Sequence, residues 1–267
     1  MKILNGSELA GFVKERQAQV VRGRLENGLR APKLLIIRDS DNPVIVKYVN
    51  LKKRYGEDIG VEVEDKLVGG VEEAKEMIKR ANADNTVSGI IVQLPLKDPL
   101  KTSEVVNLIA PKKDVDGLSQ VSDEKKFESA TATAINWLLT GYNIELRRKR
   151  VALVGYGRLV GKPLKKIWKA SGIDVTVFEH DSDLRGLRDY DIIVSATGVP
   201  HLIKSEMVGL DAVVVDAGTA SEDGVLVGDV DEEVRKRDDL LAITPKIGGV
   251  GPLTVSVLFE DVIAAAN

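Results

Sequence analysis

The segment that most constrains this chain is a glycine turn between a short apolar run and an amphipathic stretch. Val151–Val154 has the pattern of a buried parallel strand, and it leads into the turn Gly155-Tyr156-Gly157. The residues that follow at helical spacing are Gly161, Leu164, Ile167 and Trp168. Glycines let the backbone turn tightly and approach a pyrophosphate, and a helix start offers free N–H groups and a favourable dipole. Strand, turn and helix together therefore predict a phosphate site.

An acidic residue strengthens this interpretation. The next predicted strand, Asp174–Phe178, is followed by Glu179, about where a dinucleotide fold places an acid on the adenosine ribose. A glycine-rich turn alone is a weak signal. With its strand, its helix and this acid, it predicts a dinucleotide-binding domain of the Rossmann type.

Composition excludes several classes of function. The 38 Lys and Arg residues nearly balance 41 Asp and Glu, so a net charge of −3 gives no reason to expect binding to nucleic acid or an anionic membrane. No apolar run approaches the ~18 residues of a membrane span, and the charged residues 14–16 occupy the place of a signal peptide's apolar region. Cysteine is absent, which excludes disulfides and thiolate chemistry. We expect a soluble cytoplasmic protein with no bound metal.

Predicted strands and helices alternate along the chain. Helices are expected at 1–30, 44–55, 72–83, 102–110, 132–140 and 254–266, and strands at 34–37, 60–64, 88–93, 151–154, 174–178, 191–195, 212–216 and 241–243. The first helix is expected to bury the stripe Leu9, Phe12, Val13, Val20, Val21 and Leu25. Such alternation favours parallel sheets covered on both faces.

The chain length suits one large domain or two modest ones. We predict a two-domain α/β protein, with an N-terminal α/β substrate domain (1–120), a C-terminal Rossmann-type domain (121–251) and a cleft between them. The polar stretch Ser119–Phe127 is the expected boundary. The final helix, 252–267, is expected to pack back onto the first domain.

Few residues stand out as chemical candidates. Tyr48 and Lys52 are four apart on a predicted helix, hence on one face, and Gln93 ends a predicted parallel strand, where open α/β sheets bind ligands. Asp114 and Asp116 lie in one turn. These residues also have structural interpretations. Lys52 could be a solvated charge and Tyr48 a half-buried core residue. The turn with Asp114 and Asp116 could be an Asx-turn, which makes a poor metal site. His180 and His201 are far apart in sequence and predict no ligand pair. Composition and spacing alone indicate a soluble dinucleotide-binding α/β protein.

Several motifs, taken together, extend this prediction. In chain order they are Ile3-Leu4-Asn5-Gly6, Asp41-Asn42-Pro43 with Tyr48-Val49 and Lys52, Gly89-Ile90-Ile91-Val92-Gln93-Leu94-Pro95-Leu96, Pro111-Lys112-Lys113-Asp114-Val115-Asp116-Gly117, Val160-Gly161-Lys162-Pro163, Ser195-Ala196-Thr197-Gly198, Gly228-Asp229-Val230 and Gly248-Gly249-Val250-Gly251-Pro252-Leu253-Thr254. Their order and spacing resemble the bifunctional methylenetetrahydrofolate dehydrogenase/cyclohydrolase family over nearly the whole chain.

This resemblance implies two reactions. Hydride passes from methylenetetrahydrofolate to a nicotinamide, and water then opens the methenyl product to the 10-formyl compound. Lys52 would be the central catalytic group, Gln93 would position and tune it, Asp116 would hold the pterin N–H donors, and Tyr48 would stack on the aminobenzoyl ring. A lysine beside a cation and screened from water has a lowered pKa, so a neutral amine near pH 7 is reasonable.

The resemblance also implies two sets of binding residues and an oligomeric state. The implied substrate-binding residues are Tyr48, Lys52, Val92, Gln93, Leu94, Asp116, Gly249, Val250, Gly251 and Pro252. The implied cofactor-binding residues are Gly155, Tyr156, Gly157, Arg158, Glu179, His180, Thr131, Thr197, Gly198 and Thr219. A homodimer is expected from the resemblance only.

Four departures from the family pattern matter. The family's Pro-Cys-Thr-Pro-x-Gly loop is replaced by residues 129–134, and its Val-Pro before the glycines by Lys246-Ile247. Its Gly-Arg-Ser turn becomes Gly155-Tyr156-Gly157, and its His-Ser pair falls on Glu179-His180. An acid at Glu179 would bond a free ribose hydroxyl and repel a 2′-phosphate, which favours NAD, whereas Arg158 and His180 could gather that phosphate. Most bifunctional members use NADP, so we expect NADP, with NAD as the alternative.

Two other hypotheses compete. A two-domain dehydrogenase of the shikimate dehydrogenase kind would also join a substrate domain to a nucleotide fold, but a small hydroxy acid needs no pterin clamp. A non-catalytic dinucleotide sensor predicts erosion of the substrate-domain motifs, whereas here those motifs are better kept than the cofactor turn.

Overall fold

The computed structural model describes residues 1–120, 127–222 and 225–267, and these divide into two compact units. The N-terminal unit comprises residues 11–130 and 255–267, and the C-terminal unit comprises residues 1–10 and 131–254. Most of the predicted boundary stretch, residues 121–126, lies outside the described residues. A two-domain α/β architecture with parallel sheets is thus confirmed.

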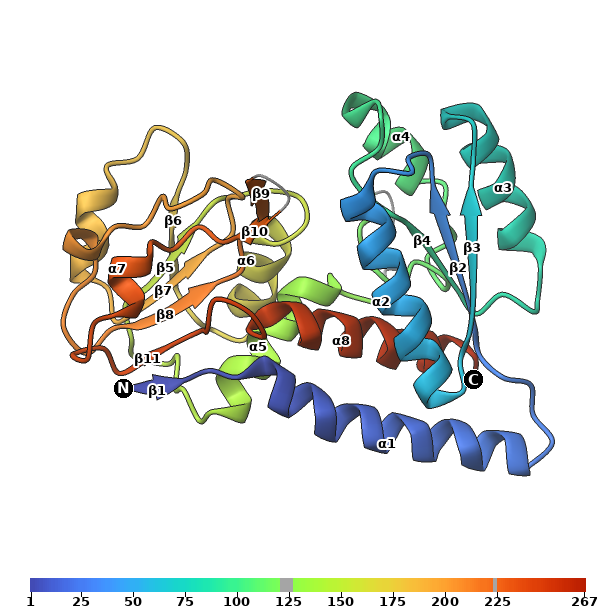
Figure 1. Ribbon diagram of the computed structural model, residues 1–267, viewed down its shortest axis with the longest axis horizontal. Coiled ribbons are helices and arrows are strands. Elements are labelled where there is room, and N and C mark those ends of the chain that lie inside the picture. The colour runs from blue at the N-terminus through green and yellow to red at the C-terminus, as the bar shows by residue number, and fades with distance from the viewer. Residues whose placement is uncertain (121–126, 223–224) are drawn as a thin grey trace. The chain divides into compact units, whose positions relative to one another are not determined.

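The N-terminal unit is built on a three-stranded parallel sheet in the order β3-β2-β4. Its strands are β2 (Lys33–Arg38), β3 (Glu62–Leu67) and β4 (Gly89–Val92), and its helices include α2 (Pro43–Ile59), α3 (Val71–Ala83) and the short α4 (Thr102–Val106), preceded by a 3₁₀ turn at Pro99–Lys101. Helices α2 and α3 lie on opposite sides of this sheet (Figure 1). The sheet is therefore covered on both faces, as the continuous apolar runs of β2 and β4 require.

Helix α2 carries two of the candidate residues and is longer than predicted. Asn42 caps its start by accepting a hydrogen bond from the Val44 N–H at 2.9 Å, and Pro43 follows directly. The predicted stop at Gly56 is wrong, because the helix continues to Ile59 and ends at Gly60, which has φ +80°. A Cβ on Gly56 would lie 2.4 Å from the Val63 side chain, so this glycine permits close packing against β3 instead of ending the helix. Strand β3 accordingly starts two residues later than predicted.

The predicted helix 102–110 is also too long, because α4 ends at Val106. Pro111 disfavours helical backbone at the residue before it. Asn107 follows α4, and its side chain accepts a hydrogen bond from the Gln120 N–H at 3.0 Å. This hydrogen bond connects the end of α4 to Gln120, beyond the turn that contains Asp114 and Asp116.

The C-terminal unit contains a six-stranded parallel sheet in the order β1-β11-β8-β7-β5-β6. Its strands are β1 (Lys2–Ile3), β5 (Val151–Val154), β6 (Val175–Phe178), β7 (Ile192–Ser195), β8 (Val213–Asp216) and β11 (Ala242–Ile243). The other elements are helices α5 (Ala130–Gly141), α6 (Gly161–Ala170) and α7 (Glu232–Arg235), 3₁₀ turns at Leu184–Asp189 and Ser205–Met207, and the hairpin β9 (Ala220–Glu222) and β10 (Val225–Val227). Strand β1 was not predicted, because two residues are too few to show an alternating pattern. We expected a helix from residue 1, but residues 1–5 are not helical.

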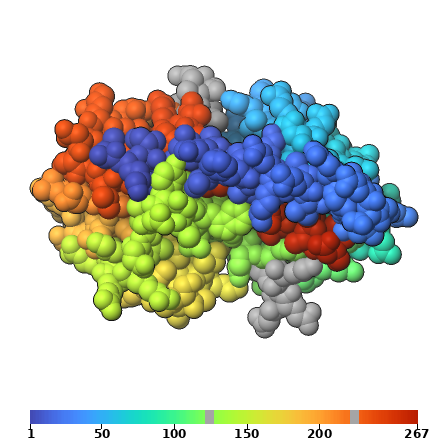
Figure 2. All heavy atoms as spheres, turned by 90° about the horizontal axis from the view of Figure 1, so that it is seen from below, coloured from blue at the N-terminus to red at the C-terminus, as the bar shows by residue number. Residues whose placement is uncertain are grey.

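The two other long helices are α1 (Gly6–Glu26) and α8 (Val250–Ala265). The stripe predicted for α1 is partly wrong: Val21 is fully buried, but Phe12, Val20 and Leu25 are exposed, and α1 lies at the surface in Figure 2. The buried contact instead includes Gln17, whose Nε2 donates to the Ser256 carbonyl at 2.8 Å and whose Oε1 accepts from the Tyr55 hydroxyl at 2.8 Å. A polar contact of this kind is invisible to hydrophobic periodicity.

Helix α8 begins four residues before the predicted Thr254. Gly248, with φ +86°, makes the preceding turn, so the glycines after it are free to start the helix. Of the helices in the described ranges, none combines the length and the apolar character that a membrane span requires.

Candidate active site

The N-terminal unit brings Lys52 and Gln93 into direct contact. Lys52 projects from α2, four residues after Tyr48 and on the same face, and Gln93 directly follows β4. The Lys52 Nζ donates a hydrogen bond to the Gln93 Oε1 at 2.8 Å. Gln93 is held in turn by its own N–H, which donates to the Ile37 carbonyl at 2.8 Å, and by its Nε2, which donates to the Leu94 carbonyl at 3.1 Å. The amide oxygen is therefore presented to the lysine by the sheet itself.

The surroundings of Lys52 lower the pKa of its amine. Burial lowers the pKa of the Lys52 amine below its usual value, and the negative charge of Asp116 acts in the opposite direction. Gln93 is uncharged, so its hydrogen bond orients the amine without adding a full counter-charge. The site is thus suited to a lysine that exchanges a proton during reaction.

Asp116 lies in a turn that two buried charged residues hold in place. The Asp114 carboxylate accepts hydrogen bonds from the Leu118 N–H at 3.3 Å and the Ser119 N–H at 2.9 Å. The Lys113 Nζ donates to two backbone carbonyls, those of Ala81 at 2.7 Å and Asp84 at 2.6 Å. Asp114 had been recognised as a turn former, but nothing in the sequence distinguished the structural Lys113 from the neighbouring surface lysine.

A second buried carboxylate supports the loop that follows Gln93. Asp39 comes directly after β2, is 2% exposed, and accepts hydrogen bonds from the Lys97 N–H at 3.0 and 3.2 Å. Asp39 was not identified from the sequence, where it precedes the polar residues 40–42. The available signal was its position at the carboxyl end of a buried strand, next to the strand that leads to Gln93.

In the C-terminal unit the glycine turn has the close packing that a dinucleotide site requires. Gly155 has φ +96°, and a Cβ there would lie 2.8 Å from the Ala196 carbonyl oxygen. A Cβ on Gly161, at the start of α6, would lie 2.2 Å from the Gly155 carbonyl oxygen. The turn and the helix start can therefore approach a pyrophosphate closely. Beside them, the ammonium groups of Lys162 and Lys165 lie 5.8 and 5.2 Å from the Tyr156 ring centroid.

Glu179 is the first residue beyond β6. Val154 and Phe178 are partners in the sheet, and the Gly155 N–H donates to the Phe178 carbonyl at 2.9 Å, so Glu179 comes at the same edge as the glycine turn. Its side chain is exposed, and its N–H donates to the Ser182 Oγ at 2.9 Å. His180 is fully exposed and pairs with Asp181 at 3.0 Å. Glu179 therefore directly follows the carboxyl end of β6, and its contact with the adenosine ribose stays a prediction.

Other predicted cofactor residues lie on the loops after β7 and β8. Gly198 has φ +71°, and a Cβ there would lie 3.6 Å from the Thr219 carbonyl oxygen, so these two loops meet. Thr197 belongs to the first of them. Thr131 lies in the first turn of α5, and Arg158 lies in the turn before α6; both are half-buried.

The predicted wall of the folate pocket lies at the start of α8. Gly249 packs against Gly6, where a Cβ would lie 1.8 Å from the Gly249 carbonyl oxygen. These residues, 249–252, belong to the C-terminal unit, whereas Lys52, Gln93 and Asp116 belong to the N-terminal unit. Their role as a folate wall stays a prediction.

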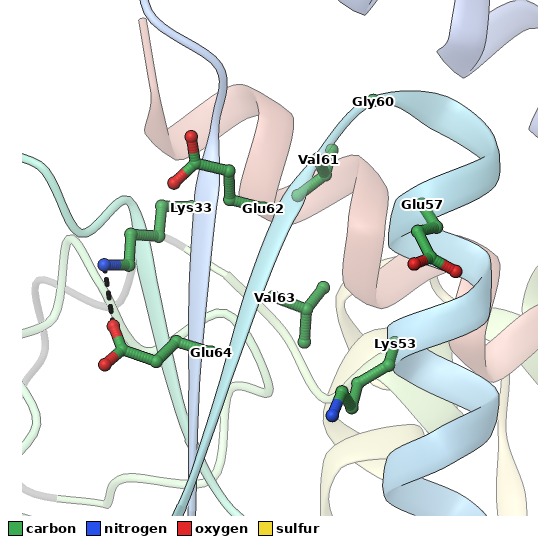
Figure 3. A pocket seen from close by; sticks show the side chains of 8 residues that line it. All are labelled: Lys33, Lys53, Glu57, Gly60, Val61, Glu62, Val63 and Glu64. Atoms are coloured by element: carbon green, nitrogen blue, oxygen red, sulfur yellow. Dashed lines mark ion pairs between the residues drawn. The ribbon is translucent and has the colours of Figure 1, made fainter.

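A groove of about 660 Å³ in the N-terminal unit contains none of the predicted site residues (Figure 3). It is lined by Lys33, Lys53, Glu57, Gly60, Val61, Glu62, Val63 and Glu64. Lys33 and Glu62 start their strands, so the groove lies at the amino end of the parallel sheet, opposite the edge where such sheets bind ligands. Lys33 and Glu64 form an ion pair across it at 2.6 Å. We interpret it as a solvated surface.

Two models of one protein family match successive parts of the chain. Residues 4–116 match the family model for the tetrahydrofolate dehydrogenase/cyclohydrolase catalytic domain. Residues 129–267 match the model for the NAD(P)-binding domain of the same family. The two matches together cover most of the chain.

Individual relatives are similar over their full length. The chain is 36% identical to the bifunctional protein FolD of Aquifex aeolicus, over 98% of this chain and 94% of that protein. It superposes on the crystal structure of the bifunctional FolD of Campylobacter jejuni with a TM-score of 0.92 and 32% identity, covering 100% of this chain and 98% of that one. The FolD of Trypanosoma brucei, solved with NADP and an inhibitor, gives a TM-score of 0.91 at 28% identity, covering 99% and 96%.

Proposed function

The chain belongs to the tetrahydrofolate dehydrogenase/cyclohydrolase family, and on that premise we propose that it interconverts one-carbon forms of tetrahydrofolate. It oxidises 5,10-methylenetetrahydrofolate to the 5,10-methenyl compound with NAD(P), and it hydrolyses that product to 10-formyltetrahydrofolate. The N-terminal unit serves as the catalytic, folate-binding domain and the C-terminal unit as the NAD(P)-binding domain.

The single observation that carries this proposal is the contact between Lys52 and Gln93 at 2.8 Å, beside the charge of Asp116. A lysine with a lowered pKa, held by an uncharged amide, is suited to acid–base work on a cationic methenyl carbon. A solvated surface lysine would have neither the burial nor the fixed partner. The family match over residues 4–116 also removes the reason to assign this unit to the substrate domain of a different dehydrogenase.

In this proposal each candidate has a separate role. Lys52 activates the attacking water and serves ring closure in the reverse direction, and Gln93 orients the lysine amine. The Asp116 carboxylate accepts hydrogen bonds from the pterin N–H groups. Tyr48, on the same face of α2 as Lys52, stacks on the aminobenzoyl ring. The turn held by Asp114 and the loop held by Asp39 keep these groups in place.

The dinucleotide fits the glycine turn, whose crowded Gly155 and Gly161 leave no room for side chains. When bound, it supplies the nicotinamide that accepts the hydride. The protein's part in that step is to align the donor carbon, since the substrate nitrogen's lone pair assists hydride loss. We propose NADP as the cofactor, supported by the NADP complex of the Trypanosoma brucei relative and by the cations of Lys162 and Lys165 beside Tyr156. Glu179 opposes this preference and leaves NAD usable.

We further propose that the protein is cytoplasmic and acts as a homodimer. The cytoplasmic location is supported by the absence of cysteine and by the charged residues 14–16, and the homodimer is supported by the family resemblance only. Size-exclusion chromatography with light scattering distinguishes a dimer from a 29.0 kDa monomer.

Two assays test the proposed function directly. Methylenetetrahydrofolate oxidation is followed by nicotinamide absorbance with NADP and NAD in parallel, and methenyltetrahydrofolate hydrolysis is followed without any dinucleotide. We expect turnover in both assays. Folded protein that binds dinucleotide but turns over neither folate would instead favour another dehydrogenase or a sensor.

The lowered pKa of Lys52 predicts the pH dependence of hydrolysis. The amine acts as a base only when neutral, so the rate should rise with pH through the lowered pKa of Lys52 and then level off. The pH at which the rate rises should lie below the pKa of an ordinary lysine, because burial disfavours the ammonium form. A profile of kcat from pH 5 to 10 checks this. A rise centred at the pKa of a free lysine would contradict the environment assigned to Lys52.

A further inference from the structure

Two buried carboxylates in the C-terminal unit have no part in the chemistry described so far. Asp216 ends β8, and Asp229 follows the hairpin β9–β10; the Asp216 side chain is 4% exposed and Asp229 is fully buried. Within the sheet, Asp216 is the register partner of Ser195, the last residue of β7. Both carboxylates thus lie below the loops that leave the carboxyl ends of β7 and β8.

Asp229 holds the loop after β7. Its Oδ2 accepts a hydrogen bond from the Ser195 Oγ at 2.7 Å and another from the Thr197 N–H at 2.7 Å. Within the described part of the chain, its Oδ1 accepts no hydrogen bond. One oxygen of the carboxylate therefore makes both contacts to this loop.

Asp216 holds the loop after β8 and also holds Asp229. Its Oδ1 accepts from the Gly218 N–H at 3.1 Å and the Asp229 N–H at 3.0 Å. Its Oδ2 accepts from the Val230 N–H at 3.1 Å and from the Arg235 Nη2 at 2.5 Å. Burial raises the pKa of Asp216, while Arg235 and the backbone donors oppose that rise. The two carboxylates thus form one chain of hydrogen bonds from α7 to the loop after β7.

Two glycines fit around these carboxylates. A Cβ on Gly218 would lie 1.8 Å from the Asp229 Oδ1, and a Cβ on Gly228 would lie 2.0 Å from the Asp216 Oδ2. The Asp229 carboxylate therefore fills the space beside Gly218 in the loop after β8, and the Asp216 carboxylate fills the space beside Gly228, the residue before Asp229. The loops can shift only if the carboxylates shift with them.

The loops held in this way present Thr197, Gly198 and Thr219 at the carboxyl edge of the sheet, where open α/β sheets bind ligands. We propose that Asp229 is a positioning residue for the dinucleotide, which fixes the loop Thr197–Gly198 against Thr219 without touching the cofactor. This inference rests on the proposed function of the C-terminal unit. It predicts an effect on dinucleotide affinity that is the same for NADP and NAD, because Asp229 acts on the loops and not on the 2′-phosphate.

The test compares Asp229→Ala with Asp229→Asn. The alanine variant loses both contacts to Ser195 and Thr197, and we expect the Kd for NADP and for NAD, measured by titration calorimetry, to rise about tenfold, with the dinucleotide KM rising alike. The asparagine variant keeps an oxygen for both donors, so its Kd should stay within about threefold of the wild type. Methenyltetrahydrofolate hydrolysis without dinucleotide should be unchanged in both.

Asp231→Asn is the matched control, since Asp231 is two residues away, caps α7 and pairs with Lys204 instead of the loops. If Asp229→Ala does not fold, Ser195→Ala removes one of the two contacts and should raise both Kd values about threefold. An unchanged Kd in the folded variant, or an equal loss of both folate activities at unchanged Kd, would overturn the proposal. Because calorimetry reports binding alone, its result stands even if the wild type turns over no folate.

Discussion

Replacing Lys52 with methionine should reduce methenyltetrahydrofolate hydrolysis about a thousandfold or more, because a positioned acid–base group contributes on the order of 10² to 10⁴ in rate. Methionine is unbranched, like lysine, but it carries no proton-exchanging atom. Oxidation of methylenetetrahydrofolate should fall much less, since the hydride step needs alignment more than proton transfer. Stopped-flow assays of the two reactions on one preparation give the ratio directly.

The chain offers a closely matched control in Lys53→Met. Lys53 is the next residue on α2, but its side chain is exposed and lines the charged groove at the amino end of the sheet. It should leave both activities unchanged. The Lys52 variant should also stay folded, because it loses one hydrogen bond and leaves the Gln93 Oε1 without this donor, at a cost of about 1 to 3 kcal/mol. Hydrolysis at the wild-type rate in folded Lys52→Met would remove Lys52 from the mechanism.

The comparison of Lys52 with Lys53 also shows how far sequence alone could reach. Helical periodicity placed Tyr48 and Lys52 on one face, and the end of a buried strand placed Gln93 at the ligand-binding edge. Neither pattern distinguishes the half-buried Lys52 from the exposed Lys53 in Leu-Lys-Lys-Arg. That distinction depends on the approach of β4 to α2, which brings the Gln93 Oε1 within 2.8 Å of the amine.

Glycines account for the main errors in the predicted helix boundaries. The sequence predicts that the helix ends before Gly56, yet Gly56 lies inside α2, where its missing side chain leaves room for Val63. Gly60, which does end the helix, is exposed and has φ +80°. A glycine required for close packing and a glycine required for backbone conformation look identical in a sequence, since both are defined by distant neighbours.

The charged residues that hold the candidate loops in place were the least predictable part of the structure. A sequence pattern assigns such residues to solvent, but their side chains are buried and form hydrogen bonds with backbone groups. They are Asp39, Lys113, Asp216 and Asp229. Their partners are far away in sequence or are backbone atoms, which carry no residue-specific signal. The acid at the end of β6 was predictable, in contrast, because its position depends only on the local strand, turn and helix order.

Glu179 should set how strongly the enzyme prefers one dinucleotide over the other. Replacing it with serine removes a carboxylate at the edge where we propose that the adenosine ribose binds, and supplies a hydroxyl donor. We expect the ratio of kcat/KM for NADP over NAD to rise about tenfold, since like charges a few Å apart at a partly solvated site cost on the order of 1 to 4 kcal/mol. Initial rates with both dinucleotides at saturating methylenetetrahydrofolate provide the ratio.

The contributions of charge and of structure can be separated with Asp174→Ser. Asp174 is an exposed acid one residue before β6, so it lies at the opposite end of the strand from Glu179. Its replacement by serine removes the same charge from the protein. Its ratio should stay at the wild-type value. The effect of Glu179→Ser should also shrink as salt is raised, because an exposed charge is screened within about 10 Å at 0.1 M ionic strength. A ratio that does not change in Glu179→Ser would mean that this side chain points away from the ribose, and that Lys162 and Lys165 beside Tyr156 determine the preference without opposition.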